Sequence, residues 1–223
     1  MTRTLPLSLG LFPLPRDLGG YPTTDGRQVA WGQLLFRVSD GSLHRAEAQR
    51  LLRQGISTSL ELQFSDDGAS FPPTSLHLHV PCRLCITSAY PDYEALTQPK
   101  GRLIEDEQRT LRSLILAIAD APSGAILING PHEEYLEWLS VMILGFVGVV
   151  DHALIEHAAI RDLTMLRIQA GWDSKEDLMV SLDRVNMELR ALHTQYHSFD
   201  AYAKVIGLSR LDLIRLRERL LDD

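Results

Sequence analysis

Four consecutive residues in the second half of the chain carry proton-transferring side chains, His132-Glu133-Glu134-Tyr135. Imidazole, carboxylate and phenol groups are common general acids and bases, and imidazole and carboxylate also bind metal ions. Two interpretations are open: an acid–base or metal-binding cluster, or the solvated first turn of a helix. Neighbouring helical residues point in different directions, so the four side chains cannot all converge on one substrate. This geometry favours the helix start.

The residues just before this cluster are typical of a helix N-terminus. Asn129 or Gly130 suits the N-cap, and Pro131 suits the first helical position, where a missing N–H costs no hydrogen bond. Glu133 and Glu134 would then lie in the first turn, where the helix dipole favours negative charge. The segment therefore predicts a helix that begins at Pro131.

The other candidates for metal or redox chemistry lack the partners that such sites need. Cys82 and Cys85 are the only cysteines, too few for a disulfide framework or a four-cysteine zinc site. A redox-active pair normally opens a helix, whereas residues 86–91 are predicted to form a loop, so we interpret both as buried or incidental thiols. His152 and His157 are five residues apart instead of four, which favours surface or core positions. We expect no metal and no cofactor.

The elements that must position these residues follow from hydrophobic periodicity. Alternating or continuous apolar runs predict strands at residues 31–38, 56–64, 75–80 and 125–128. Periodicity near 3.6, punctuated by glycine, predicts helices at residues 45–54, 105–121, 131–147, 151–170, 174–197, 198–206 and 209–221. Asp25-Gly26 is a turn signal, Gly55 suits a C-cap, and Ser209 suits the N-cap of the last helix. Strands alternating with helices predict an α/β fold, with a mostly parallel central sheet flanked by helices and a helical C-terminal half.

Composition limits the class of protein. The 223 residues are 45% hydrophobic and 23% charged, which is enough for one globular domain, and no composition shift marks a linker, so we expect a single domain over residues 1–223. A formal charge of −7 argues against nucleic acid and acidic lipid surfaces as partners. The two cysteines suit a reducing compartment, and residues 1–15 show no cleavage pattern, so we expect a cytoplasmic protein. The apolar run at residues 141–150 is too short to span a membrane and predicts a core helix.

One ordered series of residues near the N-terminus resembles a known family. The series Arg16-Asp17-Leu18-Gly19-Gly20-Tyr21, followed by Asp25-Gly26-Arg27, Val29 and Gly32, resembles the opening of the bacterial protein tyrosine phosphatases, a family that includes dual-specificity and lipid phosphatases. The likeness resumes at residues 51–56, at Glu61, along the strand at residues 123–129, and at the end of the chain from Gly207 to Leu221. It implies one domain with the fold of these phosphatases.

The resemblance also implies a catalytic loop that this chain does not carry. After the strand, the family has His-Cys, then Ala-Gly-Lys-Asp, then Arg-Thr-Gly at the start of a helix. Counting back from Gly148 without a gap places Asn129 at the cysteine and Tyr135 at the arginine. The same count places other residues at the histidine, glycine, lysine, aspartate, threonine and second glycine, namely Ile128, His132, Glu133, Glu134, Leu136 and Glu137. Neither cysteine of the chain has an arginine six positions later.

These replacements remove the groups on which the family mechanism depends. A cysteine phosphatase attacks phosphorus with a thiolate, whereas the Asn129 amide is a poor nucleophile with no proton that titrates near neutral pH. An arginine clamps two phosphoryl oxygens, whereas Tyr135 offers one neutral donor. Pro131 deletes a backbone N–H of the phosphate cradle, and Glu133 and Glu134 bring charge of the wrong sign.

Softer departures from the family pattern concern residues around the loop. Glu61-Leu62-Gln63 stands where the family has Asp-Leu-Arg, and His157-Ala158 stands where it has Asp-Tyr. The resemblance places Arg16 and Asp17 at the border of the pocket, and the alternative is that both only tie the N-terminal turn to the core through an ion pair. These departures put the substrate contacts of the family in doubt.

The sequence therefore favours a pseudophosphatase that binds an unidentified protein partner or small-molecule ligand. A second hypothesis is an enzyme of another reaction class, with His132, Glu133, Glu134 or Tyr135 as acid or base in the reshaped pocket. A third, less favoured hypothesis is residual phosphatase activity through another nucleophile. The strength of the first hypothesis is that the scaffold is kept while the nucleophile and the arginine are both replaced.

Overall fold

A computed structural model of the chain describes residues 15–38, 45–65, 82–89, 104, 107–130, 133–158 and 175–222. Within these residues, the strands of one sheet are ordered β1-β2-β5-β3-β4. The five strands are β1 (Arg16–Asp17), β2 (Leu34–Val38), β3 (Ile56–Ser65), β4 (Cys82–Ala89) and β5 (Ala125–Gly130). All pairings are parallel except that of β1 with β2. The sheet is therefore mostly parallel, as predicted.

Strand β5 lies in the middle of the sheet, between β2 and β3. All six of its residues are buried, which explains why its apolar run is continuous instead of alternating. The Cα partners Leu35↔Leu127 and Ser59↔Leu127 fix its register with both neighbours. The central strand therefore sets which residues of β2 and β3 lie side by side.

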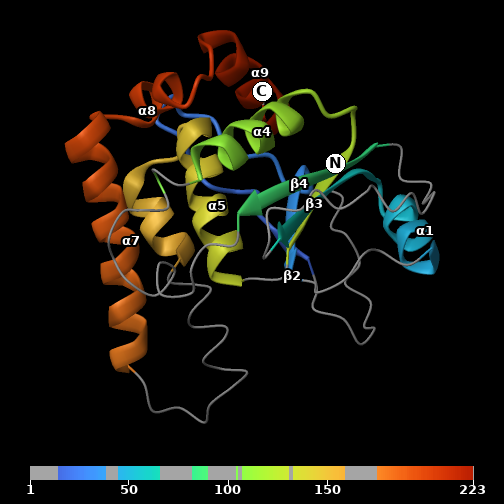
Figure 1. Ribbon diagram of the computed structural model, residues 1–223, viewed down its shortest axis with the longest axis horizontal. Helices are drawn as coiled ribbons and strands as arrows, with labels where there is room; N and C mark the ends of the chain where they lie inside the picture. Colours follow the sequence, from blue (N-terminus) through green and yellow to red (C-terminus); the bar gives the residue numbers. More distant parts are fainter. Residues whose placement is uncertain are drawn as a thin grey trace.

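The two faces of the sheet pack against different helices. Helix α1 (Arg45–Arg53) places Leu51 in a small cluster with Leu35 and Leu127. Leu34, Ile126 and their same-face neighbours join a much larger core with helices α4 (Gln108–Ala119) and α5 (Glu133–Val147). Figure 1 shows the sheet between α1 on one side and α5 on the other. The fold is thus a sheet flanked by helices.

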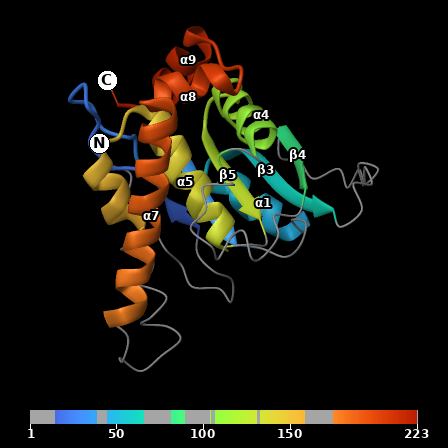
Figure 2. The ribbon, with the colours of Figure 1, turned by 60° about the vertical axis from the view of Figure 1, so that its left-hand side comes forward.

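The C-terminal half is helical in the described residues. Residues 151–158 are helical, and α7 (Lys175–Tyr196), α8 (Phe199–Val205) and α9 (Arg210–Leu220) follow. Figure 2 shows α8 and α9 at one end of the molecule near α4. Ser209 caps α9 in a capping box with Asp212, which confirms the predicted N-cap. Gly145 of α5 allows the Phe199 ring to approach, because a Cβ there would lie 2.2 Å from that ring.

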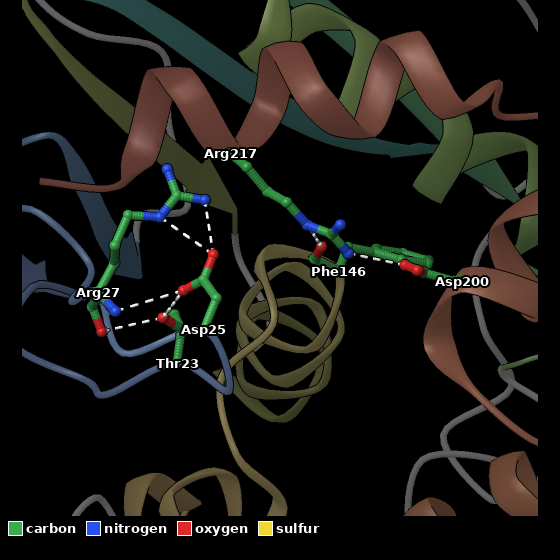
Figure 3. A network of polar contacts seen from close by, with 6 residues as sticks. All are labelled: Thr23, Asp25, Arg27, Phe146, Asp200 and Arg217. Atoms are coloured by element: carbon green, nitrogen blue, oxygen red, sulfur yellow. Dashed lines mark hydrogen bonds and ion pairs between the residues drawn. The ribbon is translucent and has the colours of Figure 1, made fainter. Parts of the chain in front are cut away.

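Side chains of α9 join it to several parts of the fold. The Arg217 guanidinium donates to the carbonyl oxygen of Phe146 at 3.0 Å and to Asp200 of α8 at 2.7 Å. Figure 3 shows both contacts beside the turn at Asp25, whose carboxylate binds the backbone and the side chain of Arg27. The hydrogen bonds of the Asp25 carboxylate hold the Asp25-Gly26 turn in place. Gly26 has a φ of +87°, which confirms the turn predicted there.

One local prediction is wrong, and others fall partly or wholly outside the described residues. Residues 86–89, expected in a loop, extend β4, because pairing with β3 across eight residues outweighs the weak local pattern. Helix α5 (Glu133–Val147) confirms a helix after β5, whereas the start expected at Pro131 lies outside the described residues. The strand expected at residues 75–80 lies outside the described residues, and so do residues 159–170 of the helix expected at residues 151–170. Among the described helices, none is long and apolar enough to cross a membrane.

Candidate functional site

A row of buried polar side chains crosses the sheet near the carboxyl ends of three parallel strands. Asn129 of β5 is the Cα partner of Arg37 on β2 and of Glu61 on β3. All three residues are at most 6% exposed. The carboxyl edge of a parallel sheet is where α/β proteins commonly bind ligands. Asn129 is also the residue that sequence analysis aligns with the family nucleophile, so this row marks the candidate site.

The Asn129 amide is engaged at both ends. Its Oδ1 accepts a hydrogen bond from Arg37 Nε at 2.9 Å, and its Nδ2 donates to Ser59 Oγ at 2.9 Å. Because Arg37 can only donate, the oxygen of the amide must face Arg37, which fixes the orientation of the side chain. The amide therefore links β2 to β3 and is committed to structure. Asn129 was also considered as a helix N-cap, and this interpretation is wrong because it lies within β5.

Tyr135, aligned with the family arginine, is a core residue. Its side chain is fully buried, its hydroxyl donates to Glu107 Oε2 at 2.7 Å, and its ring lies 5.8 Å from that of Trp138. Glu107 is also buried and lies just before α4. A tyrosine buried in this way cannot donate a proton to a substrate in a solvent-filled pocket.

The side chains of Asn129 and Tyr135 belong to different sides of the sheet. Asn129 continues the alternation of Leu127, which packs on the α1 face. Tyr135 belongs to the large core that α4 and α5 form on the opposite face. The two positions that would hold nucleophile and arginine therefore do not converge in this structure.

The remaining loop residues are described only in part. Pro131 and His132 lie outside the described residues, and Glu133 and Glu134 are the first two residues of α5, with only their backbone described. Gly130, also considered as an N-cap, is the last residue of β5, and since the next two residues are not described, its role as an N-cap stays a prediction. A Cβ at Gly130 would lie 3.3 Å from Leu136 Cδ2, so the start of α5 packs tightly onto the end of the strand.

Arg16 connects the N-terminal strand to two helices. Its Nη1 forms an ion pair with Glu137 Oε2 at 2.9 Å, and its Nη2 donates to the carbonyl oxygen of His157 at 2.8 Å. Sequence analysis left Arg16 either at the pocket border or in such an ion pair. These contacts give Arg16 the second role, and they leave its place at a pocket border untested.

Asp17 organises the turn that follows it. Its two carboxylate oxygens accept hydrogen bonds from the backbone N–H groups of Gly19 at 2.9 Å and Gly32 at 2.8 Å. Burial raises the pKa of Asp17 above its ordinary value, and the two N–H groups partly offset that rise. The turn requires glycine because a Cβ at Gly19 would lie 2.5 Å from the Trp31 Cα atom. The Gly19-Gly20 motif is thus explained by the close approach of Trp31.

A buried polar cluster around His157 was not found by sequence reasoning. The imidazole is fully buried, with Nε2 at 2.7 Å from Ser140 Oγ and Nδ1 at 2.7 Å from the Tyr21 hydroxyl. The serine–histidine contact is the pattern of a nucleophile and its base, but Ser140 is only 2% exposed and closed to substrates. The available signal was that Glu137 and His157 both depart from the family pattern, and both contact Arg16.

The two cysteines are extended along β4, at the register positions of Thr58 and Glu61. Cα atoms three residues apart in a strand are separated by about 10 Å, beyond the reach of a disulfide. A redox-active pair between Cys82 and Cys85 is therefore incompatible with this strand. Within the described residues, no group of three or more histidine, cysteine or acidic side chains is arranged to hold a metal ion.

Comparison with known proteins gives one positive result. Residues 15–129, just over half of the 223 residues, match the tyrosine phosphatase family. The matched segment includes the Gly19-Gly20 motif and β5, and it ends at Asn129, before the rest of the loop. No curated protein matches the chain.

Proposed function

Because the chain belongs to the tyrosine phosphatase family, we propose that it is a pseudophosphatase, which uses the family scaffold to bind a protein partner or a small ligand without hydrolysing phosphate esters. The observation that carries the proposal is the Asn129 amide at the nucleophile position. It is a poor nucleophile, and it is hydrogen-bonded to Arg37 and to Ser59. Without a thiolate, the covalent phosphoenzyme intermediate of the family mechanism is not expected to form there.

Two further features support this proposal. Tyr135, at the arginine position, is buried with its hydroxyl on Glu107, so it cannot clamp phosphoryl oxygens. Neither cysteine precedes an arginine by six positions, so no second phosphate loop replaces the first. The burial of Tyr135 also weakens the alternative of a new acid–base enzyme, since it withdraws one of the four candidate groups.

The partner class follows from charge and from the kind of scaffold. The formal charge of −7 disfavours nucleic acid, and the cysteine usage favours a reducing, cytoplasmic setting. We therefore propose a protein or small-molecule ligand in the cytoplasm, with no cofactor required for binding.

Phosphatase assays test the proposal directly. The purified chain, Asn129→Cys and Asn129→Leu are assayed on an aryl phosphate, on phosphotyrosine peptides and on phosphoinositides. We expect no turnover above the buffer rate in any of the three, because Asn129→Cys restores a thiol without the arginine clamp. Turnover that survives purification and disappears in Asn129→Leu would overturn the proposal. Leu211→Ala, at an exposed site on α9, controls for contaminating phosphatase.

A binding measurement tests whether the loop after β5 still binds an anion, which the absence of turnover alone does not decide. We expect thermal unfolding of the chain to be unchanged by millimolar inorganic phosphate or vanadate, because Pro131 removes a cradle N–H and two glutamates follow it. A saturable rise in the unfolding temperature, abolished by Asn129→Leu, would show that an anion site persists at this position.

A further inference from the structure

Five residues from three separate segments form the buried cluster around His157. They are Arg16 of β1, Tyr21 in the following turn, Glu137 and Ser140 of α5, and His157 in the helical residues 151–158. The contacts span 121 and 141 positions of sequence for the pairs Arg16–Glu137 and Arg16–His157. The cluster therefore joins the N-terminal motif to two helices that follow the sheet.

The hydrogen bonds determine which nitrogen of His157 carries the proton. Arg16 Nη2 lies 2.9 Å from His157 Nδ1, and because a guanidinium only donates, Nδ1 must be the acceptor. Ser140 Oγ donates to the carbonyl oxygen of Glu137 at 2.7 Å, so its remaining interaction with His157 Nε2 must be as an acceptor. Both constraints lead to the same tautomer, a neutral imidazole with its proton on Nε2.

The charged and titratable groups around the imidazole support this state from each side. Arg16 is a cation at Nδ1, and Tyr21 remains a neutral hydroxyl, because burial raises its pKa above the ordinary value. Glu137 Oε1 lies 3.5 Å from Nε2, on the side that already carries a proton. Glu156 is a further charged group near Tyr21, and it also raises the pKa of that hydroxyl. A second proton on the imidazole would have to bind Nδ1, next to the Arg16 guanidinium.

We propose that these five residues form a proton-sensitive latch, in which neutral His157 holds Arg16 and protonation of His157 releases it. A proton on Nδ1 would point an N–H group at the guanidinium and remove the lone pair that accepts from it. Arg16 would then lose its contact with Nδ1 and move from its position beside Glu137 and the His157 carbonyl oxygen. The N-terminal strand would be detached from the helix at residues 151–158.

The direction of the pH effect follows from counting protons. The closed latch binds none on Nδ1, whereas an unfolded histidine takes one up as pH falls through about 6.5. The unfolded chain therefore binds more protons below that pH, and the contribution of the latch to stability is full at higher pH and lost as pH falls. This inference does not depend on the proposed pseudophosphatase function.

Nitrogen NMR of the full chain tests the tautomer. The eight histidines are labelled with ¹⁵N, and the His157 signals are assigned by their absence in His157→Asn. At pH 7.5 we expect a protonated Nε2 and an unprotonated Nδ1 for His157. A proton on Nδ1, or an imidazolium at that pH, would overturn the latch.

Unfolding by urea between pH 8 and pH 5 tests the consequence. His157→Asn keeps an oxygen that can accept from Arg16 at every pH. We expect the unfolding constant of the unaltered chain, divided by that of His157→Asn, to rise by up to about tenfold per pH unit below pH 6.5. His152→Gln, an exposed histidine on the same helix, should follow the unaltered chain. A ratio that stays constant with pH would contradict the proposal.

A second variant covers the case in which His157→Asn does not fold. Arg16→Gln removes the cation, so the latch predicts that His157 becomes an imidazolium at a higher pH than in the unaltered chain. If the His157 signals titrate identically with and without Arg16, the guanidinium does not control protonation and the proposal fails.

Discussion

Asn129, which sequence analysis aligns with the family nucleophile, links neighbouring strands near the end of the central strand. The Asn129 amide accepts from Arg37 and donates to Ser59, so it joins β2 and β3 across β5. A cysteine could not do both, because a thiol is only a weak donor and acceptor. The Asn129 side chain is therefore part of the polar interior of the sheet.

The two hydrogen bonds of the Asn129 amide predict that this side chain contributes to the free energy of unfolding. Asn129→Leu leaves Arg37 Nε without its present acceptor and Ser59 without its present donor, so we expect a loss of about 1–3 kcal/mol in the free energy of unfolding. Asn129→Asp keeps an oxygen for Arg37 and should cost less than Asn129→Leu. Urea unfolding at pH 7 measures both. Equal costs for the two variants would show that the bond to Arg37 is unimportant.

Among the elements, the last helix has the clearest local cause. Ser209 Oγ accepts from the Asp212 N–H, and Asp212 Oδ2 accepts from the backbone N–H of Ser209 at 2.8 Å. The hydrogen bond from the Ser209 side chain, followed by that from its backbone, lowers the pKa of Asp212 below its ordinary value. A carboxylate in the first turn also interacts favourably with the helix dipole.

The capping carboxylate predicts a pH-dependent contribution of α9 to stability. Because the pKa of Asp212 is lowered on folding, its contribution is full above about pH 4, the range of an unfolded aspartate, and is lost as pH falls through the lower folded value. Asp212→Asn should therefore reduce stability by about 0.5 kcal/mol at pH 7, and the difference should shrink as pH falls below about 4. Glu218→Gln, exposed on the same helix, is the control. A difference that does not decrease as pH falls below about 4 would contradict this explanation.

Elements with strong local signals were predictable, and those fixed by distant contacts were not. The buried run of β5, the Gly55 C-cap and the Ser209 N-cap all follow from residues close in sequence. The extent of β4 depends on pairing with β3, and the end of β5 depends on pairing with β2, so neither boundary was predicted. At the site, the position of Asn129 was predictable but its partner Arg37 was not, because 92 residues separate them.

At the scale of the whole molecule, the C-terminal segment closes onto the N-terminal motif. Leu221 forms a bridge with Val29, the Ala30 N–H donates to the carbonyl oxygen of Leu220, and the Asp222 N–H donates to that of Gln28. Each of these contacts joins a residue within the family match at residues 15–129 to a residue near the end of the chain, beyond that match. We therefore propose that residues 1–223 form one domain, which depends on α9.

A matched pair of substitutions on α9 tests this proposal. Leu216 is fully buried against the core, whereas Leu211 is 62% exposed on the same helix. We expect Leu216→Ala to lower the free energy of unfolding by about 2–5 kcal/mol, and Leu211→Ala to change it by less than about 0.5 kcal/mol. If the chain is one domain, Leu216→Ala must also lower the protection of β5 amides from hydrogen exchange, because opening of the sheet then requires the same global unfolding. Unchanged protection in β5, with α9 alone destabilised, would show that the helical half unfolds independently of the sheet.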